Sequence, residues 1–301
     1  MAMLLGAAAL LRGRELPPGT IQLVFQPAEE GGAGAAAMLR AGALLPSTRA
    51  IFAVHVWPYP GHATGTVASR AGTLMAASVS WSARFHGRGG HAALPHANVD
   101  PVVPAAAAIL ALQQLVSRET SALDSAVISA TVLRAGTPTS FNVAPDDAEV
   151  GGTLRALRGD TFDRLQLRML QVVDAIAAAH RCNVTLSFSP DGRPEPYPPL
   201  VNDDAAWAFA RRVAADMLGD ARAVSVLDAP LMTAEDFSFF AKRVPHAAML
   251  LLGAYNASAG AVHALHSPRF TLDEAVLPIG VALHAALAIE FLRAGGELRA
   301  G

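Results

Sequence analysis

The hydropathy pattern changes in the middle of the chain, and this change constrains the fold more than any other feature. From about Ala76, apolar and polar residues alternate with a period of two. The apolar side of this alternation carries, in order, Val79, Trp81, Ala83 and Phe85. Such alternation is typical of a strand with one buried and one exposed face. The sequence therefore predicts an antiparallel-type strand here, unlike the continuous apolar runs found earlier and later in the chain.

Further elements follow this strand in a regular order. The pattern predicts a helix over about 100–118, strands over 126–133 and 149–157, an amphipathic helix over 162–176 and a strand over 184–188. In the second helix the apolar residues are spaced by three and four positions, which is the period of one helix face. The order β-α-β-β-α-β is the ferredoxin-like arrangement. We therefore expect residues 76–189 to form a compact inserted domain.

The regions on either side of this insert mix helices with short apolar strands. Before it, the pattern predicts helices over 1–12 and 33–41 and strands over 21–25 and 51–54. After a proline-rich link it predicts helices over 203–218 and 233–241, a strand over 247–252 and a final helix reaching 292. Thr233 is expected to cap the second of these helices, and Thr271 with Glu274 to form a capping box before the last. Strand, helix and strand in succession indicate a parallel βαβ unit. The sequence thus predicts an α/β protein whose parallel-rich domain comprises residues 1–75 and 190–301.

Composition excludes several classes of function. The chain of 301 residues has a formal net charge of −2 and contains one cysteine. Nucleic acid binding and membrane-surface binding usually need a basic face, which this balance does not favour. One cysteine rules out an internal disulfide framework. The apolar stretches are short or interrupted by polar residues, so we expect a soluble protein with no membrane partner, cytoplasmic by default.

Acidic and imidazole side chains follow two neighbouring predicted strands. Glu29 and Glu30 come after the strand at 21–25, and His55 ends the strand at 51–54. Ligands of parallel α/β sheets bind at the carboxyl ends of the strands, so these side chains could converge. A carboxylate and an imidazole suit zinc or manganese, and a second carboxylate could accept a proton from water. The alternative is two solvated glutamates at a helix N-terminus and a buried histidine.

Other polar residues are weaker candidates. In the insert, His91 follows a glycine-rich turn, Asn142 lies in a loop and Arg155 lies on the polar face of a strand. Together they could polarise a carbonyl and bind a carboxylate, although each could equally be an ordinary surface residue. Of the late histidines, His266 is the best ligand candidate, because Pro268 favours an extended conformation at the residue before it.

Seven short motifs in the same order resemble those of the zinc-type aminoacylase and carboxypeptidase family. The match is closest to its N-acyl-amino-acid amidohydrolases, which include hippurate hydrolases and indole-acetyl-amino-acid hydrolases. The motifs extend across nearly the whole chain, at residues 24–34, 55–58, 89–93, 141–143, 151–155, 234–238 and 266–268.

The resemblance implies an α/β catalytic domain with two divalent ions, manganese or zinc, and a ferredoxin-like lid that also forms a homodimer. The substrate would be a small molecule, an N-acyl amino acid. By motif, Glu29 resembles the general base, and the residues that resemble metal ligands are Glu30, His55 and His266. His91 resembles the lid histidine that stabilises the oxyanion. The remaining matches are Asn142 and Arg155, which resemble substrate-binding groups, and Glu235, which would lie behind the metal ligands.

One part of the family pattern is absent from this sequence. The family has a Cys-Gly-His-Asp motif, with further strands before it, ahead of the helix that here starts at Met1. The motif supplies a cysteine and a histidine to the metals, and Cys182 matches a lid position instead. We therefore expect an N-terminally truncated chain with an incomplete metal site and weak or no turnover. The alternative is a non-catalytic, dimerising remnant of the family.

Overall fold

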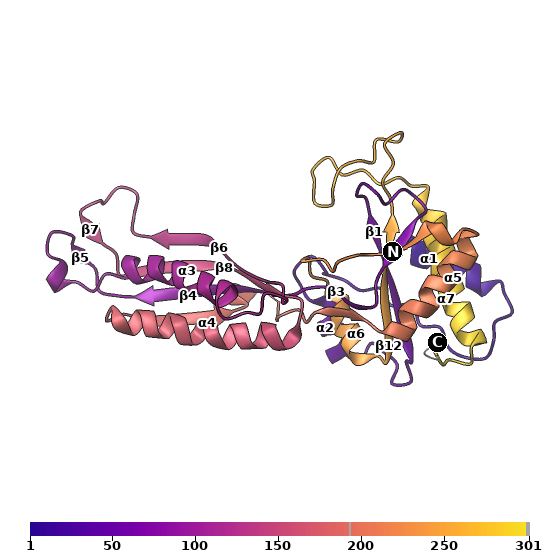
Figure 1. Cartoon of the computed structure of the whole chain (residues 1–301), viewed down its shortest axis with the longest axis horizontal. Coiled ribbons are helices and arrows are strands. Elements are labelled where there is room, and N and C mark those ends of the chain that lie inside the picture. The colour runs from indigo at the N-terminus through magenta and orange to yellow at the C-terminus, as the bar shows by residue number, and fades with distance from the viewer. Residues whose placement is uncertain (193, 299–301) are drawn as a thin grey trace.

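The computed structural model describes residues 1–192 and 194–298 of the chain, which form a mixed α/β structure. Figure 1 shows two bodies arranged along the long axis of the molecule. We call the body built from residues 77–188 the antiparallel body, and the remainder the mixed-sheet body. The hydrophobic core of the antiparallel body consists of buried residues between Ala77 and Cys182, whereas the other cores draw on segments before and after it.

The antiparallel body is a four-stranded sheet with two helices on one face. The strand order is β6-β8-β4-β9, and all three pairings are antiparallel. The strands and helices are β4 (Ala77–His86), α3 (Val102–Ser117), β6 (Ala126–Ala135), β8 (Asp147–Ala156), α4 (Gly159–Ala179) and β9 (Asn183–Phe188). A short ribbon at the far end pairs β5 (Gly90–His91) with β7 (Val143–Ala144), next to a 3-10 turn at Pro95–Ala97.

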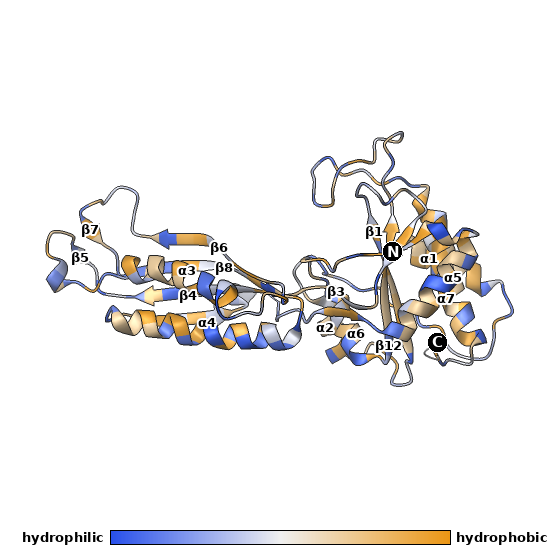
Figure 2. Ribbon diagram, viewed as in Figure 1, coloured by the Kyte–Doolittle hydropathy of each residue, from blue (hydrophilic) through white to orange (hydrophobic). Residues whose placement is uncertain are grey.

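Alternation along the sequence explains how this sheet meets its helices. In β4 the apolar positions are buried, including Trp81 and Phe85, while most of the intervening positions are partly exposed. Apolar and polar residues also recur along α4 (Figure 2), here at the spacing of a helix. Leu165 and Met169 lie fully buried on the face toward the sheet. The predicted order of elements over 76–189 is therefore present in the structure.

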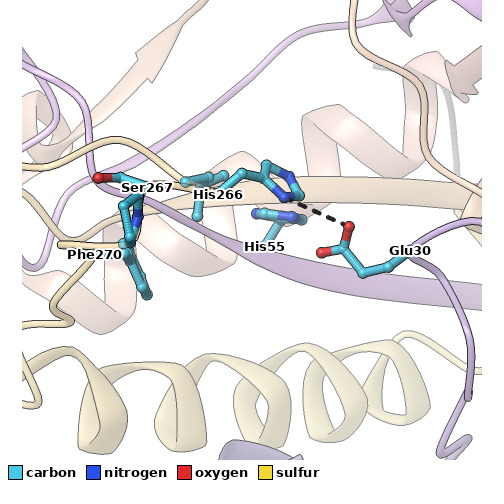
Figure 3. A pocket seen from close by; sticks show the side chains of 7 residues that line it. Glu30, His55, His266, Ser267 and Phe270 are labelled. Atoms are coloured by element: carbon cyan, nitrogen blue, oxygen red, sulfur yellow. Dashed lines mark ion pairs between the residues drawn. The ribbon is translucent and has the colours of Figure 1, made fainter.

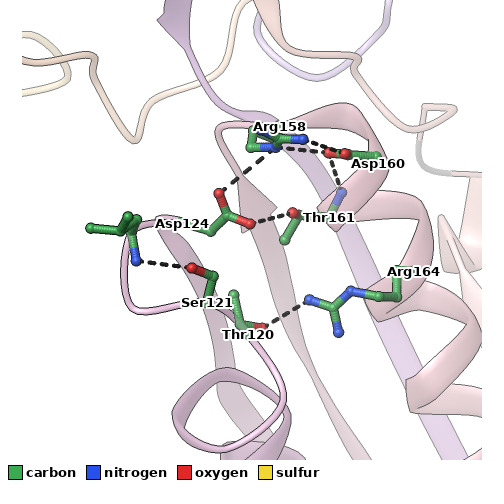
Figure 4. A network of polar contacts seen from close by, with 8 residues as sticks. Thr120, Ser121, Asp124, Arg158, Asp160, Thr161 and Arg164 are labelled. Carbon is green, nitrogen blue, oxygen red and sulfur yellow. Dashed lines mark hydrogen bonds and ion pairs between the residues drawn. The ribbon is translucent and has the colours of Figure 1, made fainter.

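A group of polar side chains joins the loop after α3 to the first turn of α4 (Figure 4). Thr161 Oγ1 donates to Asp124 Oδ2 at 3.0 Å, and Arg158 Nε lies 3.7 Å from the other oxygen of the same carboxylate. Arg164 Nη2 donates to Thr120 Oγ1 at 3.2 Å. Exposed ion pairs contribute little to stability, so we assign this group to the ordering of the loop.

The mixed-sheet body is a four-stranded sheet with helices on both faces. Its order is β1-β12-β2-β11, with β1 and β12 parallel, β12 and β2 antiparallel, and β2 and β11 parallel. The strands are β1 (Ala50–Trp57), β2 (Val67–Ser69), β11 (Val224–Val226) and β12 (His246–Gly253). A separate pair is formed by β3 (Gly72–Met75) and β10 (Leu200–Asn202).

Strand β12 lies inside this sheet and contributes to both faces. Leu250 and Leu252 pack into one core, whereas Met249 and Leu251 pack into the other. The helices of the first face are α1 (Ala2–Arg12), α5 (Asp204–Leu218) and α7 (Val276–Arg293), and those of the second are α2 (Gly34–Arg40) and α6 (Phe237–Arg243). 3-10 turns also lie at Pro190–Gly192 and Ala221–Ala223.

Helix α7 is long and apolar enough to cross a membrane by length and composition alone. In the structure it contacts α1, α5, β1 and β12. Its buried residues, including Leu283 and Leu287, belong to the cores of this body. Packing inside the mixed-sheet body therefore accounts for its hydropathy.

Three sequence predictions in this body are wrong. The segment Ile21–Phe25 is not a strand, and within the described residues β1 pairs with β12 alone. An extended backbone without a partner leaves its hydrogen bonds unmade. Thr233 does not cap a helix, since α6 begins at Phe237 after Asp236. The capping box is also absent, because α7 begins only at Val276.

Candidate metal centre

The two adjacent glutamates lie in a tight turn that leads into α2. Gly32 N donates to Ala28 O at 2.9 Å, and Gly31 N donates to Glu29 O at 2.6 Å. Ala28 has a φ of 56°, in the left-handed region that alanine rarely adopts. The turn leaves Glu29 partly buried and Glu30 exposed. The glutamates are thus presented by a closed and strained loop rather than by the helix itself.

Two histidines reach the same place from distant parts of the chain. His55 is near the carboxyl end of β1, and its Nδ1 lies 2.7 Å from Val56 O. If Nδ1 carries the proton and donates to that carbonyl, Nε2 remains available as a ligand. His266 lies in the loop before α7 with a φ of 61°, and its Nδ1 is 3.6 Å from Glu30 Oε2.

One pocket of about 450 Å³ is lined by Glu30, His55 and His266 (Figure 3). Figure 3 shows the imidazoles of His55 and His266 near each other, with the Glu30 carboxylate facing them. The remaining lining residues come from the same loop as His266: Leu265, Ser267, Pro268 and Phe270. The side chains of His266 and Glu30 are 73% and 76% exposed, so an ion can reach them from solvent. Two imidazoles and a carboxylate form a donor set that fits zinc or manganese.

A cluster of carboxyl groups lies behind the exposed glutamate. Ligand atoms of Glu29, Glu235 and Asp236 all lie within 4.8 Å of one another. Burial, and then the charges of Asp236 and Glu30, raise the pKa of Glu29. Burial, and then the charge of Glu29, raise the pKa of Glu235 to about 8. Within this cluster Glu235 therefore holds a proton more readily than a free glutamate does, and a cation bound there would have to displace that proton.

The candidate residues of the antiparallel body are divided between its two ends. His91 and Asn142 are neighbours in the ribbon at the far end, where Ala92 N donates to Asn142 O at 2.9 Å (Figure 1). Both are exposed, and the structure does not bring them to the pocket within one chain. Arg155 lies elsewhere, in β8, and its Nη1 donates to Met232 O at 2.9 Å in the mixed-sheet body.

Asp236 and Tyr197 were not predicted from the sequence. Asp236 is fully buried and accepts a hydrogen bond from Ala35 N at 3.0 Å, at the start of α2. The Tyr197 hydroxyl donates to Glu29 O at 3.1 Å. Asp236 is adjacent to Glu235 in the motif at residues 234–238, so the motif could have identified Asp236 as a candidate. Tyr197 lies in a proline-rich link, where no pattern marked it.

The chain belongs to peptidase family M20/M25/M40, whose family model matches residues 1–290. It is 43% identical over 297 residues to IAA-amino acid hydrolase ILR1-like 2 of Arabidopsis thaliana, covering 97% of this chain and 64% of that protein. It is 34% identical to N-acetylcysteine deacetylase of Bacillus subtilis, covering 96% of this chain and 71% of that protein. The chain spans less than two thirds of the length of the Arabidopsis relative.

Solved structures of the family share the architecture. The YXEP protein of Bacillus subtilis, described as a dinuclear metal binding peptidase from the M20 family, has a TM-score of 0.76 and 30% identity. The match covers 97% of this chain and 70% of that one. The mixed α/β fold with parallel and antiparallel sheets is therefore that of the family, which confirms the resemblance inferred from the motifs.

Proposed function

We propose that this chain belongs to a metal-dependent amidohydrolase that cleaves the amide bond of N-acyl amino acids. The observation that carries the proposal is the convergence of Glu30, His55 and His266 on one pocket next to Glu29. The substrate class rests on relatives whose names describe hydrolysis of an IAA-amino acid and deacetylation of N-acetylcysteine. Each of these compounds joins an acyl group to an amino acid through an amide.

The side chains that would bind the metal are those that line the pocket. Glu30, His55 and His266 would hold a divalent cation, manganese or zinc, as part of a two-ion centre. The cation supplies Lewis acidity toward the amide carbonyl oxygen. These three side chains are the part of the proposed ligand set that lies within the 301 residues given.

Glu29 would carry the proton in the reaction. Its carboxylate takes a proton from the attacking water as the new C–O bond forms at the amide carbon. It then returns the proton to the nitrogen as the C–N bond breaks, giving a carboxylic acid and a free amino acid. Burial raises its pKa toward the operating pH, which suits a general base. Glu235 would lie behind it, not on the metal.

Residues 76–189 would form a ferredoxin-like lid inserted between the catalytic parts 1–75 and 190–301. His91 would stabilise the oxyanion, and Asn142 and Arg155 would help bind the substrate carboxylate. Because His91 lies at the far end of the antiparallel body, we propose that a second copy supplies it in a homodimer formed through the lid. The exposed apolar side chains on α3 and β6 that favour such a contact are Val103, Leu110, Val127 and Leu133.

A second candidate is a dimerising protein without catalysis, in which the lid is the functional part. The same exposed apolar side chains support it, as does the separation of His91 from the pocket. Limited proteolysis separates the two proposals. Survival of residues 76–189 alone, with or without Mn²⁺, supports the dimerising protein, whereas protection of the whole chain by Mn²⁺ supports the enzyme.

Hydrolysis of benzoylglycine in the presence of Mn²⁺ tests the proposed enzyme directly. We expect release of glycine that Glu29→Gln reduces by about 100-fold or more, because general base catalysis contributes on that scale. His263→Ala is the matched control, since His263 lies in the same loop as His266 but does not line the pocket. Turnover that survives Glu29→Gln unchanged would reject the assigned base.

A further inference from the structure

We propose that Tyr197 and Asp236 are positioning residues that fix the turn carrying Glu29 and Glu30. The inference rests on the proposed function, because it concerns the residues that orient the base and one metal ligand. Both positioning residues come from far along the chain, and neither lines the pocket. They act on the backbone of the turn and not on the substrate.

The turn needs support from outside, because its own backbone is strained. Ala28 and Ala33 both adopt left-handed conformations, with φ of 56° and 48°. At Gly34 the chain passes so close to Pro27 that a Cβ would lie 1.7 Å from the Pro27 carbonyl oxygen. Strained conformations persist only where the surrounding structure holds them. The contacts that hold this turn therefore decide where its glutamates point.

Tyr197 ties together the two sides of the turn with one hydroxyl group. The hydroxyl donates to Glu29 O and accepts from Ala33 N, each at 3.1 Å. Its ring packs edge-on against Phe239, with ring centroids 5.8 Å apart. The hydroxyl thus bonds directly to the backbone of the proposed base, while the ring is fixed by α6.

Asp236 supports the turn from its other side. One carboxylate oxygen accepts from Ala35 N at 3.0 Å, and the other accepts from the Gln26 side chain. The residues before and after the turn are therefore bonded to the same carboxylate. Asp236 is fully buried, and a buried carboxylate is tolerated only where such donors satisfy it. Its position is accordingly well defined.

Tyr197 also connects the turn to the antiparallel body. Its backbone pairs with Ser78 at the start of β4, through Tyr197 N to Ser78 O at 2.9 Å and Ser78 N to Tyr197 O at 3.0 Å. One residue therefore bonds to β4 through its backbone and to the glutamate turn through its side chain. Movement of the antiparallel body relative to the pocket would act on Glu29 through this residue.

Amide hydrogen exchange of the metal-free chain, followed by mass spectrometry, tests the support of the turn without any ligand. Tyr197→Phe keeps the ring and removes only the hydroxyl, so the fold is retained. We expect peptides covering residues 27–36 to exchange about tenfold faster in this variant, the scale of one lost hydrogen bond. Asp236→Asn should have the same effect, since its amide nitrogen can accept no hydrogen bond.

Titration with Mn²⁺ alone, followed by the EPR signal of the free ion, tests the consequence for the pocket. Loss of a residue that orients metal ligands typically weakens binding by 10-fold or more, and we expect about tenfold for Tyr197→Phe. Tyr255→Phe is the matched control, because no hydrogen bond from its hydroxyl is present among the described residues, and it should match the wild type in both measurements. If Tyr197→Phe exchanges faster over residues 27–36 but binds Mn²⁺ as tightly as the wild type, the positioning role is overturned.

The two proposals fail in different ways. A wild-type chain that binds no Mn²⁺ overturns the proposed function, and the positioning role falls with it. A wild-type chain that binds Mn²⁺, while Tyr197→Phe remains folded by circular dichroism and changes neither exchange nor affinity, overturns the inference about Tyr197 and leaves the proposed function intact.

Discussion

The two bodies of this molecule differ in how their strands are paired and in which parts of the chain form their cores. In the antiparallel body, β4 and β8 are paired on both sides, and a single core is built from one continuous stretch of chain. In the mixed-sheet body, β1 is an edge strand and the cores combine distant segments. The segment before the glutamate turn forms no β pairing within the described residues. The candidate centre lies entirely in the second body. Regular packing is thus concentrated in one body, and the candidate chemistry lies on the irregular edge of the other.

Substituting one aromatic residue in each body tests this comparison with the largest expected effect on the free energy of unfolding. Trp81 in β4 is 1% exposed, whereas Phe25 in the unpaired segment is 40% exposed. Trp81→Ala should lower the free energy of unfolding by about 3–5 kcal/mol. Phe25→Ala should lower it by about 1 kcal/mol or less. Urea unfolding followed by circular dichroism measures both, and similar losses would show that the two regions are equally well packed.

Glu235 gives the second test, because its burial predicts in which direction the stability of the chain changes with pH. Its pKa rises from an ordinary value of 4.5 to about 8 on folding. The folded state therefore binds the extra proton, so the stabilisation is complete below pH 4.5 and is lost as the pH rises through 8. Glu235→Gln should remove this loss and stabilise the chain at pH 9 by on the order of 3 kcal/mol.

Thermal unfolding of the wild type and of Glu235→Gln between pH 5 and pH 9 is the measurement. Glu149→Gln is the control, because Glu149 lies in the antiparallel body and accepts a hydrogen bond from Ser82 outside the acidic cluster. Parallel stability curves for the wild type and Glu235→Gln would contradict the burial of an ionisable carboxyl group in the mixed-sheet body.

Added Mn²⁺ should sharpen the contrast between the bodies. At a free concentration 100 times its dissociation constant, a ligand specific for the native state stabilises it by about 2.7 kcal/mol. We expect slower amide exchange over residues 27–57 and 262–270, and no change over 126–156. Exchange measured with and without Mn²⁺ checks this, and unchanged exchange over residues 27–57 and 262–270 would argue against the assigned site.

The contrast between the bodies also decided what the sequence could predict. In the antiparallel body the strands and helices each bury one face in a single core, so the alternation around Trp81 and the helical spacing around Met169 were sufficient. In the mixed-sheet body the same kind of apolar run at Ile21–Phe25 did not become a strand, since its state depends on a partner and not on local pattern. The short strands β2, β3, β10 and β11 were missed for the same reason.

The candidate site was predictable where the chemistry was local to a motif. Glu30, His55 and His266 were identified as candidates from the sequence, and the structure places them around one pocket. Their roles, and those of the other candidate residues, stay predictions. Tyr197 could not be found this way, because its contact with Glu29 spans 168 positions and leaves no periodic signal.

Equilibrium dialysis against Mn²⁺ or Zn²⁺ tests the central claim most directly, namely that Glu30, His55 and His266 together bind a divalent cation. The account predicts saturable binding of at least one ion per chain, lost in both His55→Ala and His266→Ala and retained in His263→Ala. Absence of saturable binding to the folded chain, or binding that all three histidine variants retain equally, would contradict it.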